Sequence, residues 1–113
     1  MGFKVALASR DGLTVADHFG FADIYQIYEI NKDGYTLLQA REVTSPRTSG
    51  EGHGLMAFSH VVMALSDVDA VVVAKIGNDA AQFVMKSGIR VFTAAGDVGE
   101  ILNSVSKNLN QKR

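Results

Sequence analysis

A continuous apolar run near the middle of the chain constrains the fold more than any other feature. The segment reads DAVVVAK from Asp69 to Lys75, with no polar residue between its two ends. A half-buried strand alternates apolar and polar residues, whereas an unbroken run is typical of a strand that is covered on both faces. Such strands lie in the centre of parallel sheets, with helices on both sides of the sheet. The run therefore predicts an α/β protein.

Helical patterns occur where this fold needs them. Leu55 to Leu65 repeats apolar residues at helical spacing. Asn78 to Lys86 is a helix of small residues, which Gly88 closes as a C-terminal glycine would. Val98 to Leu109 places apolar residues at i, i+3, i+4, i+7 and i+11. We expect three helices, two of which connect strands.

The remaining apolar segments predict strands. They are Phe3 to Ala8, Ile24 to Ile30, Tyr35 to Val43 and Ile89 to Ala94. The turn Asn31-Lys32-Asp33-Gly34 indicates a hairpin, because the Asp-Gly pair tolerates positive φ. The segment from Thr44 to Gly54 has no apolar residue and is expected to be an exposed loop.

This order of elements fixes a simple topology. The first three strands are closely joined and predict an antiparallel meander, while the last two follow helices and predict right-handed parallel crossovers. With strands numbered along the chain, we expect a mixed five-stranded sheet in the order 3-2-1-4-5, with strand 2 antiparallel and helices on both faces. This is the ribonuclease H-like arrangement. A uniform composition without repeats predicts a single domain over residues 1–113.

Composition excludes several classes of function. The net charge is −1, from 11 basic and 12 acidic residues, so no basic footprint for nucleic acid is present. Cysteine is absent, which excludes disulfides and thiolate metal sites. The apolar N-terminal segment is too short for a signal peptide or a membrane span. We expect a cytoplasmic protein with no nucleic-acid or membrane partner.

Polar residues and glycines converge at one edge of the predicted sheet, where strands 1, 3, 4 and 5 end. Ligands of open α/β sheets favour this edge, and helix N-termini and basic side chains there favour an anion. The candidate binding residues are Arg10, His18, Phe19, Gly20, Gly52, His53, Lys75, Ile76, Gly77 and Asn78.

Each of these residues also has a simpler interpretation. A lone histidine in a loop is more often a surface residue than a ligand, and this applies most to His53. Phe19 can plug the end of the core, and Lys75 to Asn78 can be an ordinary turn from strand to helix. His60 lies away from the apolar stripe of its helix, and we expect no role for it.

Catalytic patterns are missing from the sequence. There is no phosphate-binding Gly-x-x-x-x-Gly-Lys-Ser/Thr pattern and no Gly-x-Ser-x-Gly. A two-metal nuclease would need acidic residues at this edge to hold its metal ions, but the strand from Phe3 to Ala8 has none. We therefore expect a protein that is not an enzyme.

Two stretches resemble a known family. They are DGLTVADHFGFADIYQIYEI from Asp11 and DAVVVAKIGNDAAQFVMKSGIRVFTAAG from Asp69. Together they are similar to the dinitrogenase iron–molybdenum cofactor-binding family, which includes the NifX- and NafY-type proteins and stand-alone relatives. The resemblance implies a ribonuclease H-like domain that binds or carries iron–molybdenum cofactor, its precursor, or another molybdenum, iron or copper sulfide cluster.

The resemblance also implies roles for particular residues. The histidine of the family's His-Phe-Gly motif falls on His18, which would be the cluster ligand or its neighbour. The family's loop of glycines and histidine falls on residues 50–54, where His53 is the second candidate metal ligand. The family's second motif falls on Ile76 and Gly77. The lack of cysteine favours transient binding, with cofactor donor and acceptor proteins as partners. A second hypothesis stays open, in which the same edge belongs to a regulatory or interaction module that binds a small anion or a partner protein without a cluster.

Overall fold

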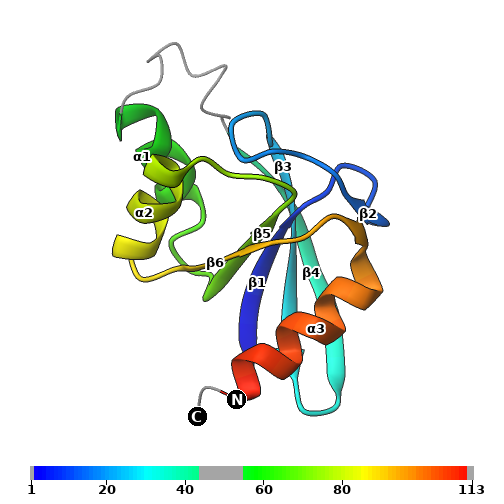
Figure 1. The fold of residues 1–113 in the computed structure, drawn as a ribbon. Helices are drawn as coiled ribbons and strands as arrows, with labels where there is room; N and C mark the ends of the chain where they lie inside the picture. The colour runs from blue at the N-terminus through cyan, green and yellow to red at the C-terminus, as the bar shows by residue number, and fades with distance from the viewer. Residues whose placement is uncertain (1, 44–54, 112–113) are drawn as a thin grey trace.

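The computed structural model describes residues 2–43 and 55–111. Within these residues the chain forms a mixed five-stranded sheet and three helices (Figure 1), as the apolar patterns predict. The strands of this sheet are β1 (Phe3–Ala8), β3 (Ile24–Asn31), β4 (Gly34–Glu42), β5 (Ala70–Val73) and β6 (Arg90–Thr93). The helices are α1 (Leu55–Ala64), α2 (Asn78–Lys86) and α3 (Val98–Gln111).

The strands pair in the order β4-β3-β1-β5-β6. β3 is antiparallel to both of its neighbours, while β1, β5 and β6 are parallel to one another. All four residues of β5 are buried, as expected for a strand between two parallel neighbours under helices on both faces. The strand is shorter than the apolar run Asp69–Lys75 that predicts it.

Helices cover both faces of the sheet (Figure 1). On one face α1 and α2 pack against the sheet through Val61, Ala80 and Val84, over strand residues that include Ala8 and Val73. On the other face α3 lies alone. Its buried residues are Val98, Ile101, Leu102, Val105 and Leu109. The amphipathic pattern of the last helix therefore faces the sheet, as its spacing predicts.

The hairpin between β3 and β4 is confirmed. Asn31 pairs with Gly34, the Asn31 side-chain oxygen accepts a hydrogen bond from the Asp33 N–H over 2.9 Å, and Gly34 has φ +136°. This hairpin and the loops that follow β1 and β5 lie at opposite ends of the sheet (Figure 1). The ladder is irregular beside Ile27 and Tyr28.

A second, two-stranded sheet was not predicted. β2 (Thr14–Val15) and β7 (Gly96–Asp97) pair antiparallel. The Leu13 carbonyl oxygen also accepts a hydrogen bond from the Val98 N–H over 2.9 Å. These bonds join the loop after β1 to the start of α3. Strands of two residues carry no periodic pattern, so the sequence offers no signal for them.

The predicted loop from Thr44 to Gly54, with Gly52 and His53, lies outside the described residues. Among the residues that are described, no helix is long and apolar enough to cross a membrane.

Candidate functional site

The segments that follow β2 and β5 run side by side at the predicted edge. His18 forms a parallel β-bridge with Lys75. The Phe19 N–H donates to the Lys75 carbonyl oxygen over 2.8 Å, and the Ala74 N–H donates to the Asp17 carbonyl oxygen over 2.9 Å. The two motifs that the sequence placed at one edge are therefore joined through their main chains.

The turn that contains His18 is anchored to the core by the buried side chain of Phe19. The Phe19 side chain is 2% exposed, and its ring packs edge-on against that of Phe58 with centroids 6.1 Å apart. The His18 carbonyl oxygen accepts hydrogen bonds from Phe21 and Ala22, which closes the turn. Phe19 thus lies in the core, as expected, while the His18 side chain is exposed above it.

Gly20 lies in this turn, directly after Phe19. The described glycines with positive φ are Gly12, Gly34, Gly88 and Gly96. The turn at Gly20 therefore does not use the left-handed backbone that favours glycine.

The second motif forms the start of α2. Ile76 is half-buried and packs against the core on the α1 and α2 face. Gly77 is the N-cap residue, with φ −73° and ψ 159°, and no side chain caps this end of the helix. A Cβ atom at Gly77 would meet no heavy atom within 4 Å, so the surface there is open. Lys75 and Asn78 are exposed beside it.

Charge at this edge is mixed. The Arg10 guanidinium forms an ion pair with the Asp23 carboxylate, with both side chains about half exposed. The positive charge of Arg10 is therefore partly balanced by Asp23, and a role of Arg10 in binding a ligand stays a prediction. Asp79 lies in the first turn of α2, where its carboxylate favours the helix but disfavours a bound anion. Lys75 adds positive charge next to His18.

The loop after β1 is held by residues outside the predicted set. Asp11 Oδ1 accepts hydrogen bonds from the N–H groups of Leu13 and Thr14, over 2.8 and 3.0 Å, and these bonds lower the pKa of Asp11. Gln26 is buried and donates from Nε2 to the Ser9 carbonyl oxygen over 3.0 Å. Asp11 before Gly12 is a signal for such a side-chain-stabilised turn.

Two buried polar atoms lie close to the His18 turn. Asp17 Oδ2 and the Tyr25 hydroxyl have no hydrogen-bond partner among the described residues. Burial raises the pKa of Tyr25, and the negative charge of Asp17 raises this pKa further. In the sequence Tyr25 looks like an ordinary strand residue, because the burial of its hydroxyl depends on the tertiary fold.

The structure brings seven predicted residues to this edge, and they form what we call the bridge site. They are His18, Phe19, Gly20, Lys75, Ile76, Gly77 and Asn78. Within the described ranges no three histidine, aspartate or glutamate side chains gather as a metal site. The bridge site thus offers one imidazole, one ammonium group and main-chain N–H groups.

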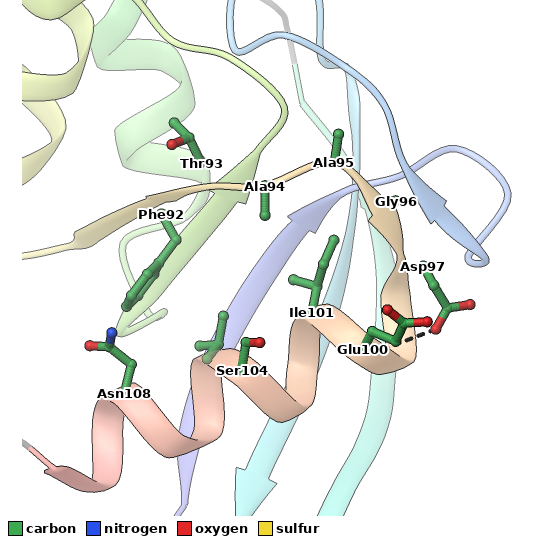
Figure 2. A pocket seen from close by; sticks show the side chains of 11 residues that line it. Phe92, Thr93, Ala94, Ala95, Gly96, Asp97, Glu100, Ile101, Ser104 and Asn108 are labelled. Carbon is green, nitrogen blue, oxygen red and sulfur yellow. Dashed lines mark hydrogen bonds between the residues drawn. The ribbon is translucent and has the colours of Figure 1, made fainter.

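A separate hollow of about 370 Å³ lies between the end of β6 and α3 (Figure 2). Its walls include Phe92, Ile101 and Asn108, and Asp97 and Glu100 lie at one end. The residues of the bridge site are not among those that line it.

Comparisons with known proteins agree with this architecture. The chain is 31% identical over 93 residues to the FeMo cofactor biosynthesis protein NifB of Sinorhizobium fredii. The match covers 82% of this chain but only 19% of the relative. The crystal structure of PH0822 superimposes with a TM-score of 0.69 at 19% identity, over 93% of this chain and 91% of the other. An NMR structure of a Thermotoga protein gives a TM-score of 0.57 at 18% identity, over 93% and 88% of the two chains.

The family assignment rests on a match to nearly the whole chain. The model of the dinitrogenase iron–molybdenum cofactor family matches residues 1–108, which include both segments of the bridge site. We conclude that the chain belongs to the dinitrogenase iron–molybdenum cofactor family.

Proposed function

We propose that this protein binds and carries a metal–sulfur cofactor at the bridge site and does not catalyse a reaction. The cargo would be iron–molybdenum cofactor, its precursor, or another molybdenum, iron or copper sulfide cluster. The observation that supports this most is the main-chain bridge between His18 and Lys75. It joins the segment that carries an exposed imidazole to the open start of a helix at one edge of the sheet.

The side chains of the bridge site fit a preformed cluster. Such a cluster brings its own sulfide and needs few protein ligands. An imidazole such as that of His18 suits iron or another transition metal as a ligand. The Lys75 ammonium offsets negative charge, and the N–H groups at the start of α2 can donate to sulfide. The open space beside Gly77 leaves room for the cluster to approach the main chain.

The same set of groups favours release. Cysteine is absent, Arg10 is paired with Asp23, and Asp79 places a negative charge in the first turn of α2. The lack of cysteine removes thiolate ligands for the metal, and the other two features weaken the attraction for an anion. A protein that must deliver its cargo needs binding of this kind, so we propose donor and acceptor proteins as partners. Gly52 and His53 remain proposed contributors, with His53 as a second metal ligand.

The names of the relatives support a place in the biosynthesis of iron–molybdenum cofactor. This chain spans 19% of the NifB protein that it matches. We propose that the domain handles a cluster on the route to iron–molybdenum cofactor. We further propose a cytoplasmic location and a ribonuclease H-like classification of the fold.

The proposal is tested by mapping a cluster analogue onto the protein. Tetrathiomolybdate is titrated anaerobically into ¹⁵N-labelled protein, and amide shifts are followed by NMR. The proposal expects the largest shifts at His18, Lys75 and Asn78. Shifts confined to other parts of the chain, or no shifts at all, would contradict it.

Molybdate, which has oxygen in place of sulfur, is the matched control ligand. If molybdate binds the same amides as tightly as tetrathiomolybdate, the site recognises an anion and not a metal sulfide. That outcome would favour the regulatory or interaction module that the sequence leaves open. A rise in thermal stability with ligand concentration measures both affinities on one scale.

A further inference from the structure

The outer edge of β6 has main-chain groups that its own sheet does not use. β6 is the last strand of the sheet and pairs with β5 alone among the described residues. The Arg90 N–H donates to the Asp69 carbonyl oxygen and the Ala94 N–H to that of Val73, each over 3.0 Å. Because N–H and C=O groups alternate in direction along a strand, those of Val91 and Thr93 face away from β5.

A groove runs beside this edge. The hollow of about 370 Å³ between β6 and α3 shares Phe92 and Asn108 with a second hollow of about 460 Å³, which extends to Met85 and Gly88. Figure 2 shows that Phe92 and Ala94 point toward α3 while Thr93 points the other way. A strand added along β6 would therefore place every second side chain over Phe92 and α3.

The other outer strand of the sheet is less suited to pairing. β4 has nine residues, but its ladder shifts register beside Ile27 and Tyr28. Bulges of this kind twist an edge away from new partners. The register of β6 is unbroken from Arg90 to Thr93. Of the two outer edges, β6 is the one that offers both a regular ladder and a groove.

Charges mark the two ends of the groove. Asp97 and Glu100 lie where the chain leaves β6, and the Asp97 carboxylate caps α3 by accepting the Glu100 N–H over 3.0 Å (Figure 2). Arg90 lies at the opposite end and is exposed. A segment that fits this pattern has an apolar centre, a basic side chain toward Glu100 and an acidic side chain toward Arg90.

We propose that the edge of β6 and the adjoining groove bind an extended segment of a partner protein by β-strand addition. Main-chain hydrogen bonds to Val91 and Thr93 would supply the pairing, and the groove between Phe92 and α3 would take an apolar side chain. This inference does not depend on the proposed cluster binding, because the bridge site does not line the groove.

The test uses short synthetic peptides as probes. They alternate threonine with leucine and carry lysine at one end and glutamate at the other, in both orders. Amide hydrogen exchange of the full chain is measured by NMR with each peptide at about 1 mM, which detects affinities that are weak by the standard of stable complexes. The proposal expects at least one charge order to slow exchange of Val91 and Thr93 by about tenfold or more. A peptide with glutamate at both ends should give less protection.

A groove-filling variant supplies the second arm. Ser104→Arg fills the groove from α3, whereas Asn103→Arg adds the same side chain to an exposed position that does not line it. We expect peptide protection to fall about tenfold in the first variant and to persist in the second. No protection by any peptide would overturn the proposal. So would protection that appears without peptide and grows with protein concentration, because the edge would then pair with a second copy of the chain.

Discussion

The Phe19 N–H donates to the Lys75 carbonyl oxygen over 2.8 Å, while the Phe19 ring is buried against Phe58. One residue thereby holds the turn of His18 both to the strand end at Lys75 and to the core. The adjacent imidazole is left exposed at a fixed place. The position of the His18 turn therefore depends on the burial of the Phe19 ring as well as on the Phe19 main-chain hydrogen bond.

Replacing Phe19 should lower the stability of the whole protein and not only that of the turn. Phe19→Ala removes a large buried side chain, and we expect the free energy of unfolding to fall by about 3–4 kcal/mol. Phe21→Ala is the matched control, because Phe21 is 57% exposed in the same turn. Its cost should stay below about 1 kcal/mol. Urea unfolding followed by circular dichroism measures both, and equal losses would show that Phe19 is not the anchor.

Gly96 of β7 and Gly77 of the bridge site should respond differently to alanine. Gly96 has φ +122° and pairs with Val15, so Gly96→Ala should cost about 1–3 kcal/mol through backbone strain. Gly77 has φ −73° and open space where an alanine methyl group would lie, so Gly77→Ala should cost no more than the difference between glycine and alanine at an N-cap, below about 1 kcal/mol. Thermal unfolding of the two variants provides the comparison. A large loss for Gly77→Ala would show that this glycine has a structural role.

The Tyr25 hydroxyl is buried without a partner among the described residues. Removing it by Tyr25→Phe should leave stability unchanged or raise it by up to about 1 kcal/mol, because no protein hydrogen bond is lost. Tyr35→Phe, at an exposed tyrosine of β4, is the control. A loss above about 1 kcal/mol for Tyr25→Phe would reveal a bound partner for the hydroxyl.

The same phenol predicts a dependence on alkaline pH. Burial raises the pKa of Tyr25 above its ordinary value of 10.0, so the folded protein keeps this proton longer than the unfolded chain does. Its contribution to stability is therefore complete below about pH 10 and is lost as pH rises above that value. Unfolding measured from about pH 8 to 11 should show a steeper loss for the natural chain than for Tyr25→Phe. Parallel curves would contradict the expected shift.

An ion pair between β4 and the turn after α1 predicts a dependence on acidic pH. The Asp67 carboxylate accepts two hydrogen bonds from Arg41, of 2.7 and 3.2 Å, which lower its pKa from 3.8 to about 2. The stabilisation is present above about pH 4 and is lost as pH falls toward 2. Because Asp67 is partly exposed, we expect about 0.5–1 kcal/mol.

Asp67→Asn tests this pair directly. The variant should be less stable than the natural chain at about pH 6 and indistinguishable from it at about pH 2. Asp33→Asn, in the exposed hairpin, is the matched control and should change neither value by more than about 0.5 kcal/mol. A difference between Asp67→Asn and the natural chain that persists at low pH would show that the ion pair is not its cause.

Much of the fold could be predicted because local patterns decide it. The apolar run around Val72 predicts a buried central strand, and Asp33-Gly34 predicts the hairpin, since each signal lies within a few consecutive residues. The pair of short strands at Val15 and Gly96 could not be predicted, because two residues have no periodicity. Their pairing depends on loops that only the complete fold brings together.

The location of the candidate site could be predicted from the sequence, but the partners of its charged and polar groups could not. The ends of parallel strands meet at one edge, so the approach of His18 to Lys75 follows from topology. The pairing of Arg10 with Asp23 does not follow from topology. Asp23 lies thirteen residues further along the chain, and the sequence has other carboxylates nearby. The buried pair of polar atoms at Asp17 and Tyr25 likewise depends on packing between distant segments.

The most direct test of the central claim is an anaerobic titration of the protein with a metal–sulfur cluster, followed by visible absorbance. The natural chain and His60→Ala, which changes an exposed histidine of α1 that is not part of the bridge site, should bind with the same dissociation constant. His18→Ala should bind at least about tenfold more weakly, which corresponds to about 1.4 kcal/mol. Equal binding by His18→Ala and His60→Ala would contradict the proposal that His18 holds the cluster.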